Sequence, residues 1–228
     1  MQIAGLQKLT LLDFPGRMAC IVFTHGCNFR CPFCHNAPLV VDERGAEYGE
    51  EAFFAFLAKR RGILDGVVIT GGEPLLAPGL EEFIERIRAA GYLVKLDTNG
   101  SFPDRLAALI ERNLLDYIAM DVKTVPEEYE RVCGVRVDIE KIEKSIRLIR
   151  ESGVPHEFRT TVVKGLHAKE DIVSVAKMLA GEPYYLQGFV DSGNLIGEGC
   201  EAFSKEEMHD IHDAAKAVTD TCFLRGIE

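Results

Sequence analysis

The chain alternates short apolar or β-branched runs with longer segments in which apolar residues recur at helical spacing. The short runs predict strands at residues 18–24, 66–70, 93–97, 117–121, 156–163 and 184–189. The longer segments predict helices at residues 50–61, 79–90, 103–112, 138–152 and 169–179. Each predicted strand is followed by a helical segment, and this order is typical of parallel βα units.

The order of these elements predicts an α/β fold. A run such as Val67, Val68 and Ile69 is apolar at every position, as expected for a parallel strand that is buried on both faces. Because crossovers between parallel strands are right-handed, successive units curl in one direction. We therefore expect an open barrel or a twisted sheet, with its functional groups at the carboxyl ends of the strands.

The length of 228 residues is typical of one α/β domain. We expect a single domain over residues 1–228, with a core at about 17–190. The remaining residues, 191–228, are predicted to form a loop and one final helix at 203–218. No repeat or low-complexity linker interrupts the chain.

Charge and hydropathy exclude several classes of protein. The 26 basic and 36 acidic residues give a formal net charge of −10, without the clustered lysine and arginine that an extended nucleic-acid surface needs. The sequence contains no apolar run of membrane-spanning length and no signal peptide at its start. We expect a cytoplasmic protein that binds neither nucleic acid nor membrane.

Three cysteines, Cys27, Cys31 and Cys34, follow directly on the first predicted strand. This crowding favours metal ligation over disulfides. An iron-sulfur cluster that only carries electrons normally has four cysteine ligands, so a triad leaves one iron open. We expect a 4Fe-4S cluster here, while the alternative that the spacing leaves open is a zinc site completed by His25 or His35.

The chain contains seven cysteines, an odd number that does not suit a complete disulfide framework. The four outside the triad lie far apart in the sequence. We expect each to be a small buried hydrophobe without chemistry. They are Cys20, Cys133, Cys200 and Cys222.

The second predicted strand ends in Thr70, Gly71, Gly72, Glu73 and Pro74. The two glycines let the backbone approach a ligand closely, Glu73 offers an acceptor for an ammonium group, and Pro74 fixes the exit into the next helix. The next two strands also end in polar residues. These side chains could have a functional role. The alternative is a structural role, since aspartates after a strand commonly form turns or cap helices. The residues concerned are Asp97, Thr98, Asn99, Asp121 and Lys123.

The C-x3-C-x2-C motif together with the Gly-Gly-Glu-Pro motif resembles the radical S-adenosylmethionine (SAM) superfamily. The resemblance implies a 4Fe-4S cluster whose fourth iron binds SAM and whose electron releases a 5'-deoxyadenosyl radical. It implies that Phe33 lies near the adenine, although Phe33 could equally pack beneath the cysteine loop. It also implies that Glu73 and its neighbours receive the methionyl amino group.

The ends of the third and fourth strands resemble the subset of the superfamily that activates glycyl-radical enzymes. This implies that Lys123 meets the SAM carboxylate and that three residues surround a monovalent cation, namely Asp97, Thr98 and Asp121. Arg159 is a weaker candidate for the carboxylate, because pairing with Glu157 or Asp121 is equally consistent. Gln187 stands where relatives often carry a histidine near the ribose, which is a departure from the pattern.

Two further stretches narrow the resemblance. Residues 12–17 are similar to the opening of glycyl-radical activases, and residues 34–38 are similar to the activating proteins of anaerobic ribonucleoside-triphosphate reductase. The resemblance runs from residue 5 to about 189 and implies a partial (βα)6 barrel. It implies that the enzyme takes a hydrogen atom from a glycine of this large reductase. Residues 38–66 have no room for an added ferredoxin-like module, so a flavodoxin or ferredoxin would deliver the electron.

Three alternatives stay open at this point. The partner could be another glycyl-radical enzyme, such as pyruvate formate-lyase. The substrate could be a small molecule, as in 7-carboxy-7-deazaguanine synthase. The third alternative is a zinc-stabilised binding protein without catalysis.

Overall fold

A computed structural model of the chain describes residues 1–41, 48–191 and 193–227. Eight strands form one sheet, and their spatial order follows the sequence. They are β1 (Gly5–Thr10), β2 (Ala19–Thr24), β3 (Gly66–Gly71), β4 (Leu93–Thr98), β5 (Tyr117–Asp121), β6 (His156–Val162), β7 (Tyr184–Gly188) and β8 (Cys222–Arg225). Strand β1 runs antiparallel to β2, and every later neighbouring pair is parallel.

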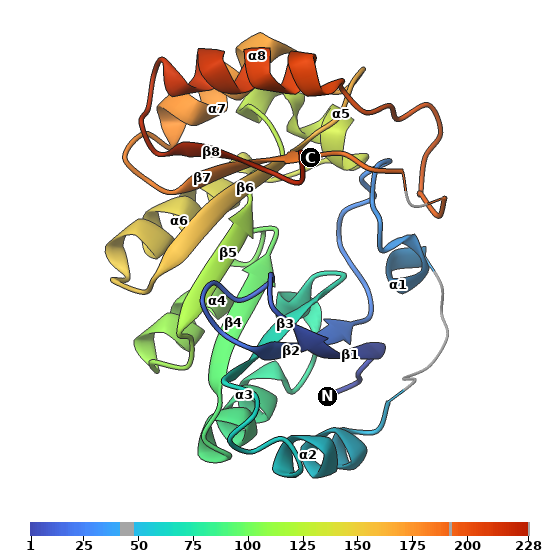
Figure 1. Cartoon of the computed structure of the whole chain (residues 1–228), viewed down its shortest axis with the longest axis vertical. Coiled ribbons are helices and arrows are strands. Elements are labelled where there is room, and N and C mark those ends of the chain that lie inside the picture. The colour runs from blue at the N-terminus through green and yellow to red at the C-terminus, as the bar shows by residue number, and fades with distance from the viewer. Residues whose placement is uncertain (42–47, 192, 228) are drawn as a thin grey trace.

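The curved sheet carries its long helices on the outer face (Figure 1). The α-helices are α1 (Ala37–Val41), α2 (Glu50–Ala58), α3 (Leu80–Ala89), α4 (Pro103–Glu111), α5 (Tyr129–Cys133), α6 (Ile139–Glu151), α7 (Lys169–Met178) and α8 (Lys205–Lys216). Two short 3-10 helices are η1 (Pro74–Leu76) and η2 (Pro126–Glu128). Within the described residues β1 and β8 are the two edges of the sheet, so the barrel is open.

The predicted partial barrel is confirmed. The six predicted strands correspond to β2 through β7, and the predicted helices correspond to α2, α3, α4, α6, α7 and α8 with ends displaced by at most three residues. Helix α8 starts where Ser204 accepts a hydrogen bond from the Glu207 amide and Glu207 accepts one from the Ser204 amide. This capping box satisfies two amides that the first turn leaves unpaired.

The prediction for the tail was only partly correct, because residues 191–228 contain β8 in addition to a loop and a helix. The prediction also missed β1. Strand β8 has four residues, too few to show a period, and β1 exposes Gln7, Lys8 and Leu9 on the sheet edge. Residues 42–47, 192 and 228 of the predicted domain lie outside the described residues.

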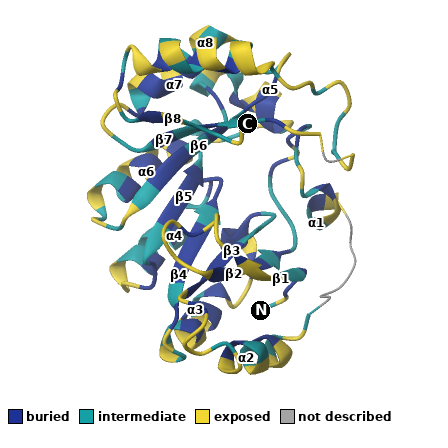
Figure 2. Cartoon of the chain, in the orientation of Figure 1, coloured by how far each residue is buried: buried dark blue, intermediate teal, exposed yellow. Residues whose placement is uncertain are grey.

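The two faces of the strands have different environments, because successive side chains point to opposite sides of a sheet. Cys20 and Val22 of β2 belong to the large cluster beneath the helices, whereas Ile21 belongs to a second, small cluster. The strands of Figure 2 are mostly dark, while exposed residues lie on the outer surfaces of the helices. In the small cluster Phe14 packs on Ala19, Ile21 and Val68.

Phe14 closes the amino-terminal end of the barrel. It is 3% exposed, and a Cβ on Gly66, the first residue of β3, would lie only 2.8 Å from its ring. The connection that carries Phe14 also exposes apolar side chains, since Leu12 is 87% exposed. Phe14 therefore fills this end of the barrel with apolar contacts, while the polar residues predicted for the site lie at the carboxyl ends of the strands.

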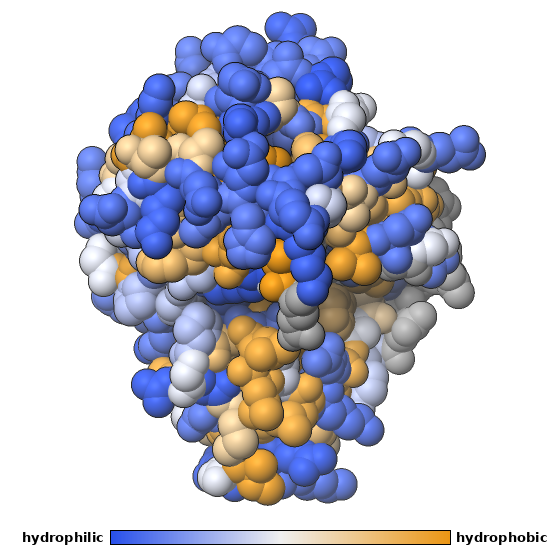
Figure 3. Space-filling model, turned by 45° about the horizontal axis from the view of Figure 1, so that its top comes forward, coloured by the Kyte–Doolittle hydropathy of each residue, from blue (hydrophilic) through white to orange (hydrophobic). Residues whose placement is uncertain are grey.

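The molecular surface is uneven in polarity. On the face shown in Figure 3 hydrophilic residues cover most of the upper part, and apolar residues gather below the centre. Within the described ranges, no helix combines the length and the apolar character that a membrane-spanning segment needs.

We expect Phe14→Ala to lower the free energy of unfolding by about 3 kcal/mol, because it leaves a cavity at the closed end of the barrel. Urea denaturation under reducing conditions measures this change. Leu12→Ala, two residues away and largely exposed, serves as the matched control and should change stability by less than about 0.5 kcal/mol. Equal losses in the two variants would contradict the role assigned to Phe14.

Candidate active site

One cavity of about 420 Å³ lies at the carboxyl ends of the parallel strands. Its size suits one cofactor or small ligand. Every residue predicted for the site lines it except Pro74, which is buried at the start of η1 beside Glu73. The lining residues predicted from the sequence are Cys27, Cys31, Phe33, Cys34, Gly71, Gly72, Glu73, Asp97, Thr98, Asn99, Asp121, Lys123, Arg159 and Gln187.

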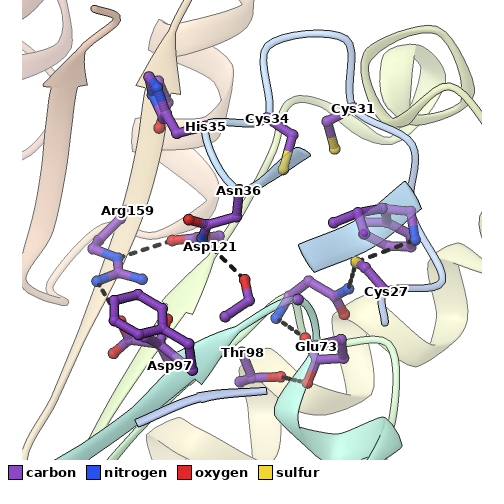
Figure 4. Close-up of a pocket in the computed structure, with 18 of the residues that line it drawn as sticks. Cys27, Cys31, Cys34, His35, Asn36, Glu73, Asp97, Thr98, Asp121 and Arg159 are labelled. Atoms are coloured by element: carbon purple, nitrogen blue, oxygen red, sulfur yellow. Dashed lines mark hydrogen bonds and ion pairs between the residues drawn. The ribbon is translucent and has the colours of Figure 1, made fainter. Parts of the chain in front are cut away.

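The three clustered cysteines lie on the connection between β2 and α1 and carry free thiols. Figure 4 shows them on one side of the cavity, with Arg159 across from them. Burial raises the pKa of Cys27 to about 11, whereas a hydrogen bond with the Cys133 thiol lowers the pKa of Cys31 to about 7. All three cysteines line the same cavity.

The other cysteines behave largely as predicted. Cys20, Cys133 and Cys222 are buried, while Cys200 is only half-buried. Cys133 departs from the prediction in a second way, because its thiol contacts Cys31 and its carbonyl accepts a 2.8 Å hydrogen bond from the amide of Arg30. It therefore helps to hold the cysteine loop.

The cysteine loop is fixed from below by the turn at Gly71 and Gly72. The Gly72 amide donates to the carbonyl of Thr24 at 3.0 Å, and the Glu73 amide donates to the carbonyl of Gly26 at 2.8 Å. A Cβ on Gly72 would lie 1.9 Å from the Gly26 oxygen, closer than any side chain can come. The two glycines thus bring the turn close to the backbone of the loop leading to Cys27, while their approach to a ligand stays a prediction.

Glu73 is fully buried directly after this turn. Its carboxylate accepts hydrogen bonds from the Asn99 amide at 2.7 Å, the Thr98 hydroxyl at 2.8 Å and the Leu75 amide at 3.1 Å. Burial nevertheless raises the pKa of Glu73 to about 7. Among the described residues no lysine, arginine or histidine pairs with it, so the carboxylate lies at the cavity without a cation.

Opposite the cysteines, Arg159 joins two aspartates from neighbouring strands. Its Nε donates to Asp121 at 2.8 Å and its Nη1 donates to Asp97 at 3.3 Å. Lys95 donates to the second oxygen of Asp97 at 2.5 Å, and Lys123 to that of Asp121 at 3.0 Å. Burial alone would raise the pKa of both aspartates, but the cations, Arg159 first, hold both pKa values below their ordinary range. Neither aspartate caps a helix.

A monovalent cation does not fit between Asp97 and Asp121 in this arrangement. All four carboxylate oxygens already accept hydrogen bonds from cationic side chains. The hydroxyl of Thr98 is directed to Glu73. The cation stays a prediction from the sequence.

Phe33 is buried at the edge of the cavity, and its place near an adenine stays a prediction. It is 4% exposed and packs beneath the loop, with its ring 6.3 Å from that of His167, yet it also lines the cavity. The Nζ of Lys123 lies 6.0 Å from the ring centroid. Gln187 reaches the cavity from β7.

The sequence prediction missed a set of amides that ties the loops together. Asn28 accepts from the side-chain amide of Asn99 at 3.0 Å and donates to Ser101 at 2.9 Å. Asn36 donates to the Gly71 carbonyl at 3.0 Å. Asparagines at both ends of the cysteine motif were the available signal, but their partners are far away in the sequence.

The zinc alternative is not supported by the geometry. Over the described residues, no three histidine, cysteine, aspartate or glutamate side chains are placed to hold a single metal ion. A zinc site requires all its ligands at about 2.0–2.3 Å from one ion. His35 stacks on Phe189 with ring centroids 5.6 Å apart. In a 4Fe-4S cluster each thiolate binds a different iron, so its ligands stand further apart.

Comparison with known families decides the classification. The Radical SAM superfamily model matches residues 21–179, from β2 through α7. The chain belongs to the radical SAM superfamily. This membership makes it an enzyme and implies a 4Fe-4S cluster and SAM as cofactors, whose chemistry suits three free thiols and a buried carboxylate around one cavity.

Two curated radical SAM proteins illustrate the range of relatives. A protein of Methanocaldococcus jannaschii, provisionally named a glycyl-radical enzyme activating enzyme, is 31% identical over 99% of this chain and 96% of its own length. The 7-carboxy-7-deazaguanine synthase of Methanopyrus kandleri is 30% identical over 76% of this chain and 74% of its own.

A solved structure supports the radical SAM fold. The radical SAM methyltransferase of Sphaerobacter thermophilus superimposes with a TM-score of 0.73 at 18% identity, covering 95% of this chain and 68% of that one. At this level of identity the likeness concerns the fold alone.

We expect Gly72→Ala to reduce the iron bound after anaerobic reconstitution several-fold, because the added Cβ would push the Gly26 carbonyl and with it the radical SAM cysteine loop. Iron per protein, measured together with the circular dichroism spectrum, checks this. Gly49→Ala is the matched control, since a Cβ there meets nothing within 4 Å. Equal iron content in both variants would contradict the steric role of Gly72.

The buried carboxyl of Glu73 should also make the stability of the fold depend on pH. Because its folded pKa, about 7, exceeds the ordinary value of 4.5, the fold loses stability as pH rises from 4.5 to 7. Relative to wild type, cluster-free Glu73→Gln should therefore gain about 2–3 kcal/mol between about pH 5 and pH 8. Urea denaturation at the two pH values measures the difference. Glu151→Gln, an exposed residue at the end of α6, should show no such change, and a flat result for Glu73→Gln would refute the buried charge.

Proposed function

We propose that this radical SAM enzyme is an activase that takes a hydrogen atom from a glycine of anaerobic ribonucleoside-triphosphate reductase. The observation that carries the proposal is the end-to-end similarity to the archaeal activating enzyme, which covers nearly the whole of both chains. Residues 34–38, which resemble reductase activating proteins, favour this partner over other glycyl-radical enzymes. We also propose that residues 1–228 act as one domain.

The proposed cofactor ligands are Cys27, Cys31 and Cys34. A 4Fe-4S cluster on these thiolates, with SAM on its open iron, supplies the electron that splits the sulfonium bond and yields a 5'-deoxyadenosyl radical. The hydrogen bond from Cys133 favours the thiolate of Cys31. Asn99 and the Phe29 amide donate to the sulfur of Cys27 at 3.8 and 3.4 Å and favour its negative charge.

The remaining residues bind and orient SAM in this proposal. Glu73, buried without a cation, accepts the methionyl ammonium, and ionisation of the carboxylate accompanies that contact. The turn that positions the Glu73 carboxylate is formed by Gly71, Gly72 and Pro74. Lys123 and Arg159 present positive charge to the SAM carboxylate, while Asp97, Thr98, Asn99 and Asp121 hold these groups in place. Phe33 and Gln187 border the space for adenine and ribose.

The size of the cavity favours a glycine as the reacting group. About 420 Å³ accommodates one ligand of cofactor size, so a bulky second molecule has little room beside SAM. A glycine of a partner loop presents a Cα–H bond without a side chain. This reaction needs the least additional space.

The similarity to 7-carboxy-7-deazaguanine synthase favours one alternative, a radical reaction on a small heterocycle. That relative covers about three quarters of this chain, so the activase remains the better supported function. Pyruvate formate-lyase is the alternative partner within the activase class. A zinc-stabilised protein without catalysis is contradicted by membership of the superfamily.

The electron donor in this proposal is an external flavodoxin or ferredoxin, and the reaction takes place in the cytoplasm. The donor can be identified by mixing each reduced protein with the reconstituted enzyme and SAM. The one that supports formation of 5'-deoxyadenosine without dithionite is the functional donor.

We expect Cys31→Ala to fold but to lose most of its iron and all SAM cleavage, because the cluster loses a ligand. Anaerobic reconstitution followed by measurement of iron and 5'-deoxyadenosine tests this. Cys200→Ala, which changes a half-buried cysteine outside the cavity, should keep both. SAM cleavage by Cys31→Ala would refute the assignment of the cluster ligands.

The partner is tested by electron paramagnetic resonance. We expect the reconstituted enzyme with dithionite and SAM to generate a glycyl-radical doublet on the anaerobic reductase and none on pyruvate formate-lyase. A doublet on pyruvate formate-lyase alone would overturn the choice of partner. Formation of 5'-deoxyadenosine without a doublet on either protein would favour the small-molecule alternative.

A further inference from the structure

The last strand of the sheet sends one charged side chain into the barrel interior. Arg225 of β8 donates from Nη1 and Nη2 to the two oxygens of Glu157, both at 2.9 Å. The guanidinium carbon lies 4.0 Å from the centroid of the Tyr185 ring. A paired, stacked guanidinium of this kind has a fixed position.

Glu157 lies between two arginines. Its side chain is 1% exposed, and its nearest cation other than Arg225 is Arg159, whose Nη1 lies 3.9 Å from Oε1. Tyr117 adds a weaker hydrogen bond to Oε2 at 3.3 Å. Arg225 supplies both strong hydrogen bonds, so Arg159 remains directed to Asp121 at 2.8 Å.

We propose that Arg225 is a positioning residue for the SAM site: by satisfying Glu157, it leaves Arg159 directed into the cavity. The inference rests on the proposed function, because SAM is the ligand through which it is tested. Arg225 itself does not line the cavity. Its influence passes through Glu157 and Arg159.

The physical reason is the cost of an unpaired buried charge. Without Arg225, the carboxylate of Glu157 would have to take its compensation from Arg159. A turn of Arg159 toward Glu157 would leave Lys123 as the main partner of Asp121. The cavity would then lose the guanidinium and would hold the ammonium of Lys123 more tightly to the protein, so both positive groups would be less available to an anionic ligand.

Strand pairing explains why a four-residue strand can have this effect. In register, Arg225 stands beside Gln187 of β7, and Gln187 stands beside Thr161 of β6. Glu157 and Arg159 are two residues apart on β6 and share one face with Thr161. Arg225 therefore reaches along the interior toward the amino-terminal end of β6.

The test compares SAM affinity in reconstituted variants by anaerobic calorimetric titration. We expect Arg225→Gln to raise the Kd for SAM about tenfold at unchanged iron content. Arg225→Lys, which keeps the charge, should stay within about threefold of wild type. Adding Glu157→Gln to Arg225→Gln should restore the affinity, because no buried charge remains to attract Arg159.

The controls separate positioning from general damage. Arg112→Gln breaks an exposed pair with Glu85 and should leave SAM affinity unchanged. If Arg225→Gln does not fold, Glu157→Gln is compared with the double variant, and the two should bind SAM equally. A lower affinity of the double variant would overturn the inference.

The test distinguishes failure of the proposed function from failure of the role assigned to Arg225. If wild-type protein carrying the cluster does not bind SAM, the proposed function fails. If wild type binds SAM and Arg225→Gln binds it equally well, only the positioning role of Arg225 fails.

Discussion

The contact between the turn at Gly71 and Gly72 and the loop after β2 is the constraint on which the rest of the site depends. Two backbone hydrogen bonds join Gly72 and Glu73 to Thr24 and Gly26, at a separation that leaves no room for a Cβ. The same residues thus set the start of the cysteine loop and the position of the Glu73 carboxylate. The proposed cluster ligands and the proposed acceptor for an ammonium group are therefore placed by one piece of backbone.

The barrel interior contains an apolar part and a charged part. At the amino-terminal end Phe14 fills the space with apolar contacts. Further along the interior, charged side chains occupy it, and of the carboxylates of Glu73, Asp97, Asp121 and Glu157 only that of Glu73 does not lie between cations. A buried carboxylate with only neutral donors has a raised pKa, and this exception marks the place where a cationic ligand group gains the most.

Local sequence patterns predicted the central strands, the long helices and more than half of the residues that line the cavity. The residues proposed to contact a ligand follow strands, and parallel strands place their carboxyl ends together, so Cys27, Glu73, Asp97 and Asp121 could be grouped from the sequence. The supporting contacts could not be predicted in this way. Asn28 and Ser101 are 73 residues apart, and Arg225 and Glu157 are 68 residues apart.

The sequence by itself determined the class of fold, the cysteine triad and the Gly-Gly-Glu-Pro turn, because each is encoded by a period or by a spacing of few residues. Only the tertiary structure decided that Arg159 bridges Asp97 and Asp121, that Cys133 contacts Cys31 and that β8 supplies a partner for Glu157. Ion pairs and thiol contacts depend on distances of a few ångströms between strands. Such distances follow from strand register and barrel curvature, which no local stretch of the chain specifies.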